Sequence, residues 1–224
     1  MIDAYAAASA PLHRLIPSRF PPIGVFDTVA TAADLQAVME LVGWTNDRLV
    51  AHRLARLPQN EWVYGRPNSS IVMAAFLHVA PNGMRFNRGE LGAWYAAAAL
   101  PTAVAEVAHH LRREALATSV AEMARTYREY ACRCNGSYLD IRGKQAAHPD
   151  VYAPDDHAAS QAFGEDVRAR GEAGIIYDSL RHAGGVNVVA YRPRNVSDTT
   201  QVDHFEIAVE AASRRIVAKK LRSS

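Results

Sequence analysis

Short β-rich runs dominate the second half of this chain, whereas its helical patterns lie earlier. The β-rich runs cover residues 138–141, 174–177, 186–191, 205–209 and 215–218. In the fourth run Phe205, Ile207 and Val209 alternate with other residues at the period of a half-buried strand, and the turn after it predicts a C-terminal hairpin. Helical spacing is found over 32–42 and from residue 101 onward. This segregation predicts an α+β fold, a single compact domain with mixed or antiparallel strands and flanking helices, rather than an alternating βαβ fold.

Residues 1–46 are expected to form an N-terminal extension before a main domain over 47–224. Prolines should interrupt regular structure early in this extension, because proline fixes φ and lacks a backbone donor. These prolines are Pro11, Pro17, Pro21 and Pro22. The length of 224 residues fits one domain that carries such an extension.

Two elements are expected around the boundary of the main domain. A helix over 32–42 should begin at Thr31 and Asp34, which have the form of a capping box, and should pack its apolar stripe on the domain. The domain itself should open with a strand over 48–58, where basic and apolar residues alternate. The apolar run over 70–79, preceded by asparagine and serine, favours a short helix.

The composition narrows the functional classes. Apolar residues make up 49% of the chain and charged residues 21%, so a packed core is expected. Lysine and arginine number 25 against 23 for aspartate and glutamate, which argues against nucleic-acid binding through overall charge. No apolar run reaches about 18 residues and no basic segment opens the chain, so neither a transmembrane helix nor a signal peptide is expected. These features predict a cytoplasmic globular protein that contacts neither membranes nor nucleic acids directly.

Common metal and nucleotide motifs are missing from the sequence. His109 and His110 are adjacent, and Cys132 and Cys134 are one residue apart, whereas zinc ligands usually follow C-x₂₋₄-C or H-x₃₋₅-H spacing. Neither G-x-G-x-x-G nor the P-loop pattern occurs, and the G-x-S-x-G serine elbow is also missing. We therefore expect no metal site, no Rossmann or P-loop nucleotide site and no serine elbow of that type.

Four polar residues stand where one concave surface can gather them. Arg85 lies in a turn, Tyr95 follows on the strand expected over 93–96, Glu106 lies on the next helix, and Ser179 is in a turn after a later strand. Glu106 lies roughly 160° from the centre of its helix's apolar stripe, so it should project away from the buried face. Each residue alone has an ordinary structural explanation. Together they can line one surface with a cation, an aromatic ring and a carboxylate.

The same residues lie in motifs that resemble the RES-domain family, named for arginine, glutamate and serine. The resemblance covers residues 48–215. The first set of motifs is Gly83-Met-Arg-Phe-Asn87, Trp94-Tyr95 and Ala105-Glu106-Val-Ala-His109, and the second is Tyr177-Asp-Ser-Leu180 followed by Gly184-Gly-Val-Asn-Val-Val189. The family's set includes an arginine of the first strand, which we assign to Arg53.

The resemblance implies an NAD-consuming toxin of a toxin–antitoxin pair, with a fold similar to ADP-ribosyltransferase toxins and no metal. Its partner would be an Xre-like DNA-binding antitoxin that blocks the active site. NAD⁺ would be the substrate, and its ADP-ribosyl group would pass to phosphate or water, which depletes NAD⁺, or to a host protein. The alternative is a non-catalytic module that only binds its antitoxin.

The chemistry of NAD⁺ gives each residue of this set an expected role. Glu106 would stabilise the positive charge that develops on the ribose, as carboxylates do in glycoside cleavage, and Ser179 would orient the ribose or the amide. Arg53 and Arg85 would pair with pyrophosphate oxygens, because guanidinium forks match phosphate. Tyr95 would stack on the cationic nicotinamide ring. The expected catalytic set is thus Glu106, Ser179 and Arg85, and the expected NAD-binding set is Arg53, Arg85 and Tyr95.

Overall fold

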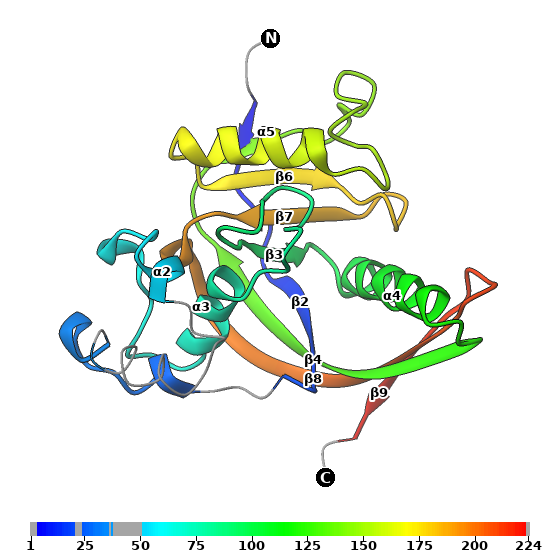
Figure 1. Cartoon of the computed structure of the whole chain (residues 1–224), viewed down its shortest axis with the longest axis horizontal. Helices are drawn as coiled ribbons and strands as arrows, with labels where there is room; N and C mark the ends of the chain where they lie inside the picture. Colours follow the sequence, from blue (N-terminus) through cyan, green and yellow to red (C-terminus); the bar gives the residue numbers. More distant parts are fainter. Residues whose placement is uncertain (1–3, 21–23, 36, 38–50, 223–224) are drawn as a thin grey trace.

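The computed structural model describes residues 4–20, 24–35, 37 and 51–222. In these ranges nine strands form one sheet, in the order β1-β5-β6-β7-β3-β2-β4-β8-β9 (Figure 1). The strands are β1 (Tyr5–Ala6), β2 (Leu12–Pro17), β3 (Trp94–Ala97), β4 (Glu122–Cys134), β5 (Tyr138–Asp140), β6 (Gly174–Asp178), β7 (Val186–Ala190), β8 (Val196–Glu210) and β9 (Ile216–Leu221). The α-helices are α2 (Ala51–Leu54), α3 (Ser69–Leu77), α4 (Leu100–Ala117) and α5 (Ala158–Ala169), with short 3-10 helices at Gly24–Phe26, Gln59–Glu61 and Pro193–Asn195.

The sheet confirms the predicted fold class. Neighbouring strands are antiparallel except β5 and β6, which are parallel, so the fold is α+β with a mixed sheet. Strands β3, β5, β6 and β7 lie where β-rich runs were expected, and β8 and β9 form the predicted C-terminal hairpin. Helices α3 and α4 also lie where helices were predicted, over 70–79 and from residue 101 onward.

Helices cover both faces of the sheet. Successive side chains of β3 point to opposite faces and show which core lies on each side. Trp94 and Ala96 pack in the core that includes α3, whereas Ala97 packs in the core that includes α4. Helix α4 contacts β2, β4 and β8, and α5 packs on β6 (Figure 1). Among the described helices, none is long and apolar enough to cross a membrane.

The expectation that residues 1–46 only precede the domain is wrong for β1 and β2. Strand β2 lies inside the sheet between β3 and β4, and it pairs with β4 from Leu12↔Cys132 to Pro17↔Tyr127. Its prolines do not prevent the strand, because Pro11 lies just before it and Pro17 is its last residue, positions that tolerate the missing N–H. The sheet therefore needs this N-terminal segment as an internal strand.

The strand expected over 48–58 is also wrong where the structure describes it. Residues 51–54 form helix α2, followed by a turn, while 48–50 lie outside the described residues. Leu54 and Leu57 are both 5% exposed and pack in the core. Because they are three residues apart, their spacing fits one face of a helical turn better than one face of a strand.

The described part of the 32–42 segment agrees with the helix prediction. Thr31 Oγ1 accepts a hydrogen bond from the Asp34 backbone N–H at 3.1 Å and donates to the Asp34 carboxylate at 2.7 Å, as expected for a capping box. Residues 32–35 and 37 are helical, and Leu35 is fully buried in the core. The rest of the predicted helix lies outside the described residues.

Strand β4 and helix α5 were not predicted. The centre of β4 carries the charged residues Arg128 and Glu129, both of which are buried, so its polarity conceals a central strand. Helix α5 contains only two large apolar residues, Phe163 and Val167, and a glycine at position 164. Both elements turn out to position the candidate site.

Candidate functional site

A cavity of about 1050 Å³ opens on the face of the sheet that carries α4. Its walls come from β2, β3 and α4, from the loop over 78–92, and from the segment over 155–158. Arg85, Tyr95 and Glu106, three of the predicted site residues, line it. The structure therefore brings these three together from a loop, a strand and a helix.

The carboxylate of Glu106 is held by two donors. Its Oε1 accepts hydrogen bonds from Ser179 Oγ and from Asn187 Nδ2, each at 2.7 Å. Ser179 Oγ in turn accepts the backbone N–H groups of Arg181 at 3.1 Å and His182 at 3.0 Å, so its own proton points to Glu106. No described residue donates to Oε2 of Glu106, which leaves this oxygen available to a ligand.

Glu106 does not point into open solvent, as its helical angle alone suggested. It is half-buried, because the turn after β6 and the start of β7 cover that flank of α4. Ser179 itself is buried behind the carboxylate and does not line the cavity. Asn187 was not singled out from the sequence, although it stands in the quoted Gly184–Val189 motif, and a buried asparagine in an apolar run is a signal that could have found it.

Arg85 reaches across the cavity mouth to the loop before α5. It donates to the carbonyls of Ala153 at 2.8 Å, Val151 at 3.3 Å and Pro154 at 3.4 Å. The turn before it requires glycine, since Gly83 has φ +70° and a Cβ there would lie 2.1 Å from the Asn87 carbonyl oxygen. These contacts fix the guanidinium at the edge of the cavity.

Tyr95 supports the same loop from β3. Its hydroxyl donates to Asn87 Oδ1 at 2.8 Å and accepts the Phe86 backbone N–H at 3.0 Å. Burial raises the pKa of Tyr95 well above its usual value, so the hydroxyl remains protonated. The ring lines the cavity while the hydroxyl group anchors the loop.

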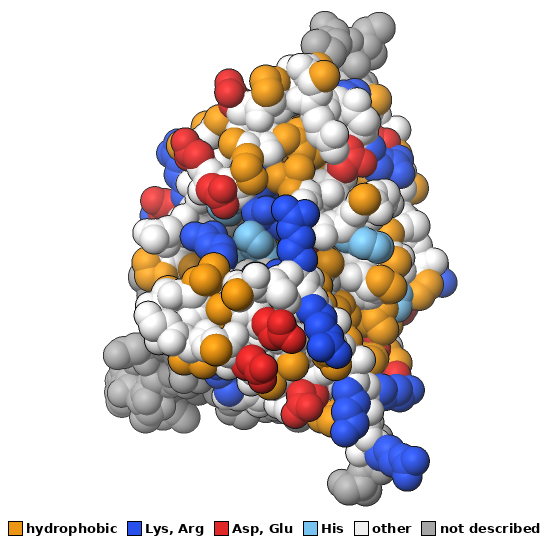
Figure 2. Space-filling model, turned by 90° about the vertical axis from the view of Figure 1, so that its right-hand side faces the viewer, with side chains coloured by type: hydrophobic (Ala, Val, Ile, Leu, Met, Phe, Trp, Pro, Cys, Tyr) orange, Lys and Arg blue, Asp and Glu red, His pale blue; other side chains and the backbone are white. Residues whose placement is uncertain are grey.

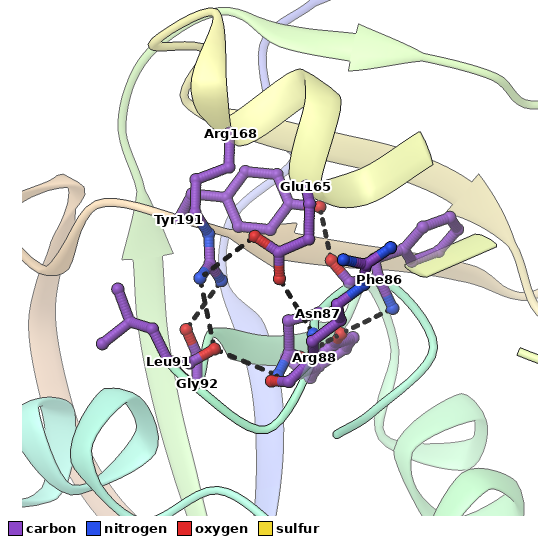
Figure 3. A network of polar contacts seen from close by, with 9 residues as sticks. Phe86, Asn87, Arg88, Leu91, Gly92, Glu165, Arg168 and Tyr191 are labelled. Carbon is purple, nitrogen blue, oxygen red and sulfur yellow. Dashed lines mark hydrogen bonds and ion pairs between the residues drawn. The ribbon is translucent and has the colours of Figure 1, made fainter. Parts of the chain in front are cut away.

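Helix α5 clamps the other end of the loop (Figure 3). Arg168 donates to the carbonyls of Leu91 at 3.1 Å and Gly92 at 2.8 Å, and its guanidinium lies 4.7 Å from the Tyr191 ring centre. From the same helix, Glu165 accepts the Arg88 backbone N–H at 2.8 Å. Helix α5 thus holds this part of the loop through its backbone.

The closest approach of the loop to α5 occurs at Gly164. A Cβ at this position would lie 2.2 Å from the Phe86 carbonyl oxygen and 2.7 Å from the Tyr191 hydroxyl, which itself donates to that carbonyl at 3.0 Å. Glycine within a helix costs about 1 kcal/mol relative to alanine. Its presence here is explained by the loop backbone that packs against it.

Arg53 lies apart from the other predicted site residues. It donates to the carbonyls of Leu77 at 2.8 Å and Gly89 at 3.1 Å and is not among the residues that line the cavity. It sits on helix α2, so the assignment of the first-strand arginine to Arg53 was wrong. Its contacts join the end of α3 to the loop, which is a structural role.

The arginine on an early strand beside the cavity is Arg14. It lies on β2, lines the cavity and donates to the Tyr95 carbonyl at 2.8 Å, with its guanidinium 4.6 Å from the Trp94 ring centre. Burial lowers the pKa of Arg14 to about 10, so it stays protonated at neutral pH. It was missed because the neighbouring prolines were taken to exclude a strand, and the pairing with β4 that stabilises this strand is not visible in the local sequence.

Five arginines line the cavity, and besides Arg14 and Arg88 they include three that we call the arginine rim: Arg85, Arg113 and Arg181. Figure 2 shows blue Lys or Arg side chains gathered around a histidine near the middle of the face that it draws. Burial lowers the pKa of Arg181, and so does the neighbouring Arg85. The rim therefore concentrates positive charge that an anionic ligand would neutralise.

Histidines beside the arginine rim stay uncharged at neutral pH. Burial, followed by the charge of Arg181, lowers the pKa of His109 to about 4. Burial also lowers the pKa of His110 and of His157, and the positive charge of Arg85 acts in the same direction on both. The described residues contain no group of three or more His, Cys, Asp or Glu arranged to hold a metal ion.

Comparison with known proteins places this architecture in a family. The family model described as "RES domain" matches residues 53–210, which is most of the chain. The chain belongs to the RES domain family. The resemblance deduced from the motifs around Glu106 and Ser179 is thereby confirmed.

Individual matches to this RES domain protein are distant. It is 25% identical over 203 residues to "Uncharacterized protein y4oC" of Sinorhizobium fredii (strain NBRC 101917 / NGR234), covering 86% of this chain and 80% of that protein. A chain in the crystal structure of the M. tuberculosis MbcT–MbcA toxin–antitoxin complex matches with a TM-score of 0.41 and 17% identity. That match covers 55% of this chain and 73% of the other, and it defines neither fold nor function here.

The RES match and the sheet do not begin at the same place. The family model starts at Arg53, whereas β2, with Arg14, lies earlier in the chain and completes the cavity wall. Of the predicted RES set, Arg85, Tyr95, Glu106 and Ser179 are therefore gathered at the cavity. Arg14 and Asn187 join them, and Arg53 does not.

The packing of the loop on α5 predicts whether one substitution raises or lowers the free energy of unfolding. Gly164→Ala should lower the free energy of unfolding by about 1–3 kcal/mol, because the new methyl group clashes with the Phe86 carbonyl. Helix propensity alone predicts the opposite, a gain of about 1 kcal/mol. Urea unfolding measures the difference, and Gly24→Ala, with nothing within 4 Å of the added carbon, is the matched control. If Gly164→Ala were as stable as the wild type or more stable, the close packing of the loop backbone on α5 would be contradicted.

Proposed function

We propose that this RES domain protein is the toxin of a toxin–antitoxin pair and cleaves the nicotinamide–ribose bond of NAD⁺. The observation that carries the proposal is the Glu106 carboxylate, which lines the cavity and is held through Oε1 by Ser179 and Asn187, while no described residue donates to Oε2. The family membership supports it, because Arg85, Tyr95 and Glu106 of the predicted RES residues line the cavity and Ser179 bonds to Glu106. The ADP-ribosyltransferase-like fold implied by the resemblance remains part of the proposal.

A fixed carboxylate suits the charge changes of this reaction. Nicotinamide leaves NAD⁺ with the bonding electron pair, and positive charge develops on the ribose ring. A preorganised negative charge stabilises such a transition state more than it stabilises the substrate. Ser179 and Asn187 hold Oε1 in place, so Oε2 of Glu106 can meet the developing charge without reorganisation.

The arginine rim suits the rest of the substrate. The pyrophosphate of NAD⁺ carries two negative charges, and Arg85, Arg113 and Arg181 offer planar donors that match phosphate oxygens. A cavity of about 1050 Å³ is large for a small-molecule site and accommodates an extended dinucleotide. Tyr95 presents its ring to the same space and is the residue proposed to stack on nicotinamide.

The biological partner and the acceptor follow from the family resemblance. An Xre-like DNA-binding antitoxin that covers the cavity is the proposed partner, and the cytoplasm is the proposed compartment. The ADP-ribosyl group would pass to phosphate, to water or to a host protein. In the competing function, a non-catalytic module that only binds its antitoxin, the chain would not consume NAD⁺.

Replacement of the held carboxylate tests the proposal. Glu106→Gln keeps the size of the side chain but removes its charge, so nicotinamide release from NAD⁺ should fall by about 10²-fold or more. The melting temperature should change little. Chromatography of NAD⁺ and nicotinamide measures the rate, and Glu122→Gln, an exposed residue at the start of β4, is the matched control.

Growth provides the second readout of the same variant. Expression of the wild-type chain without its antitoxin should arrest cells and lower their NAD⁺, whereas Glu106→Gln should not. Wild-type turnover by purified Glu106→Gln would overturn the catalytic role. If high-level expression of the active wild-type protein did not harm cells, the toxin assignment would be overturned, whereas the proposed enzymatic activity would stand.

The two arginines of the predicted NAD-binding set should now behave differently. Arg85→Lys should lower kcat/KM for NAD⁺ by about 5- to 150-fold, the equivalent of 1–3 kcal/mol for the loss of a charged hydrogen bond. Arg53→Lys should instead lower the free energy of unfolding by about 1–2 kcal/mol, since its bonds to Leu77 and Gly89 are structural. Steady-state kinetics and urea unfolding of both variants check this, and a larger catalytic loss in Arg53→Lys would reverse the assignment.

A further inference from the structure

His13 and Glu129 form a carboxylate–histidine pair on the floor of the cavity. Nδ1 of His13 lies 2.7 Å from Oε1 of Glu129. The side chain of Glu129 is 4% exposed, whereas that of His13 is 21% exposed and lines the cavity. No described residue bonds to Nε2 of His13, so this nitrogen is the atom of the pair that a ligand can reach.

The sheet places His13 opposite the held carboxylate. Asn187, which donates to Glu106, pairs with Ala97 of β3, and Ala97 pairs with His13 of β2. Residues paired directly across antiparallel strands point to the same face. Two strand spacings put the backbones of Asn187 and His13 about 10 Å apart, and only the methyl group of Ala97 lies between them in that row.

Room between two catalytic groups is a known chemical requirement. Enzymes that cleave a glycosidic bond with direct attack by water keep their two catalytic groups roughly 6.5–9.5 Å apart, which leaves room for the sugar and the water. Because only the methyl group of Ala97 separates Asn187 from His13 in the row, a ribose beside Glu106 would have space for one acceptor molecule on the side of His13.

The buried carboxylate fixes which ring nitrogen faces the cavity. Glu129 lies at an irregularity of the sheet, where Arg128 pairs with His204 but Tyr130 pairs with Gln201, and such bulges re-aim side chains. A carboxylate buried here needs a donor, and His13 supplies Nδ1–H. Nε2 is then the ring nitrogen left to accept a hydrogen bond or a proton from a ligand in the cavity.

We propose that His13, oriented by Glu129, is the general base that activates a neutral hydroxyl acceptor in NAD⁺ cleavage. This inference rests on the proposed function. The acceptor oxygen forms a bond to the anomeric carbon of the ribose, and the bond from that carbon to the nicotinamide nitrogen breaks with its electron pair going to nicotinamide. The acceptor's proton goes to Nε2 of His13. The reaction thus balances as NAD⁺ plus a hydroxyl compound giving the ADP-ribosyl product, nicotinamide and a proton.

The proposal separates two classes of acceptor. Water or an alcohol must lose a proton as it attacks, so it needs the base. An anion without an acidic proton, such as azide, does not. His13 should therefore govern the choice of product rather than the departure of nicotinamide.

The test is a competition between water and azide in the full-length protein. With both nucleophiles present, His13→Gln should raise the ratio of azido product to ADP-ribose by about 10²-fold or more, the usual scale for loss of a general base. The ratio is read by mass spectrometry and does not depend on which step limits the rate. A purely structural ion pair would change stability without changing this ratio.

A second variant keeps the test valid if His13→Gln folds poorly. Glu129→Gln retains the imidazole but removes the carboxylate that orients it, and it should shift the product ratio in the same direction by a smaller factor. His204→Gln on β8 is the matched control and should leave the ratio unchanged. Melting curves of all variants establish that the proteins compared are folded.

Two outcomes overturn the proposal in distinguishable ways. An unchanged product ratio in both His13→Gln and Glu129→Gln, with wild-type cleavage intact, would remove the base and leave NAD⁺ cleavage standing. If the wild-type protein released no nicotinamide with either nucleophile, the proposed function and this inference would fail together.

Discussion

Strands β2 and β3 are neighbours in the described sheet, yet their pairing is limited to His13 and Ala97. On one side of this contact β3 pairs along its length with β7, and on the other side β2 pairs along its length with β4. The two halves of the sheet are therefore joined at His13 and Ala97 and separate beside them. Arg14 bridges the opening through the Tyr95 carbonyl and the Trp94 ring. The cavity lies over this junction, and the site depends on how the two halves of the sheet meet there.

Around the junction, backbone contacts set the positions of the reactive side chains. Helix α5 binds the loop that carries Arg85 through main-chain carbonyls and one main-chain N–H group, with Gly164 allowing the close approach. Ser179 is held by two N–H groups of its own turn and donates its hydroxyl hydrogen bond to Glu106.

The sequence patterns located the elements with strong local signals and failed where long-range packing decides. The motifs around Glu106 and Ser179 indicated the family, and the periodicity of the C-terminal hairpin and of α4 was sufficient. Strand β4 was missed because its buried Arg128 and Glu129 look like surface residues until their partners are known. Arg53 was predicted as the strand arginine in place of Arg14. The short strand β2 gains its stability from pairing with β4, and no local pattern reveals that pairing.

The central claim is that the cavity over this junction cleaves NAD⁺ at the carboxylate of Glu106. The most direct measurement is the release of free nicotinamide from NAD⁺ by the purified wild-type chain, followed by chromatography in buffers with and without phosphate. The account predicts nicotinamide and an ADP-ribosyl product in equal amounts in at least one of the two buffers. Intact NAD⁺ in both, with a protein shown to be folded, would contradict it.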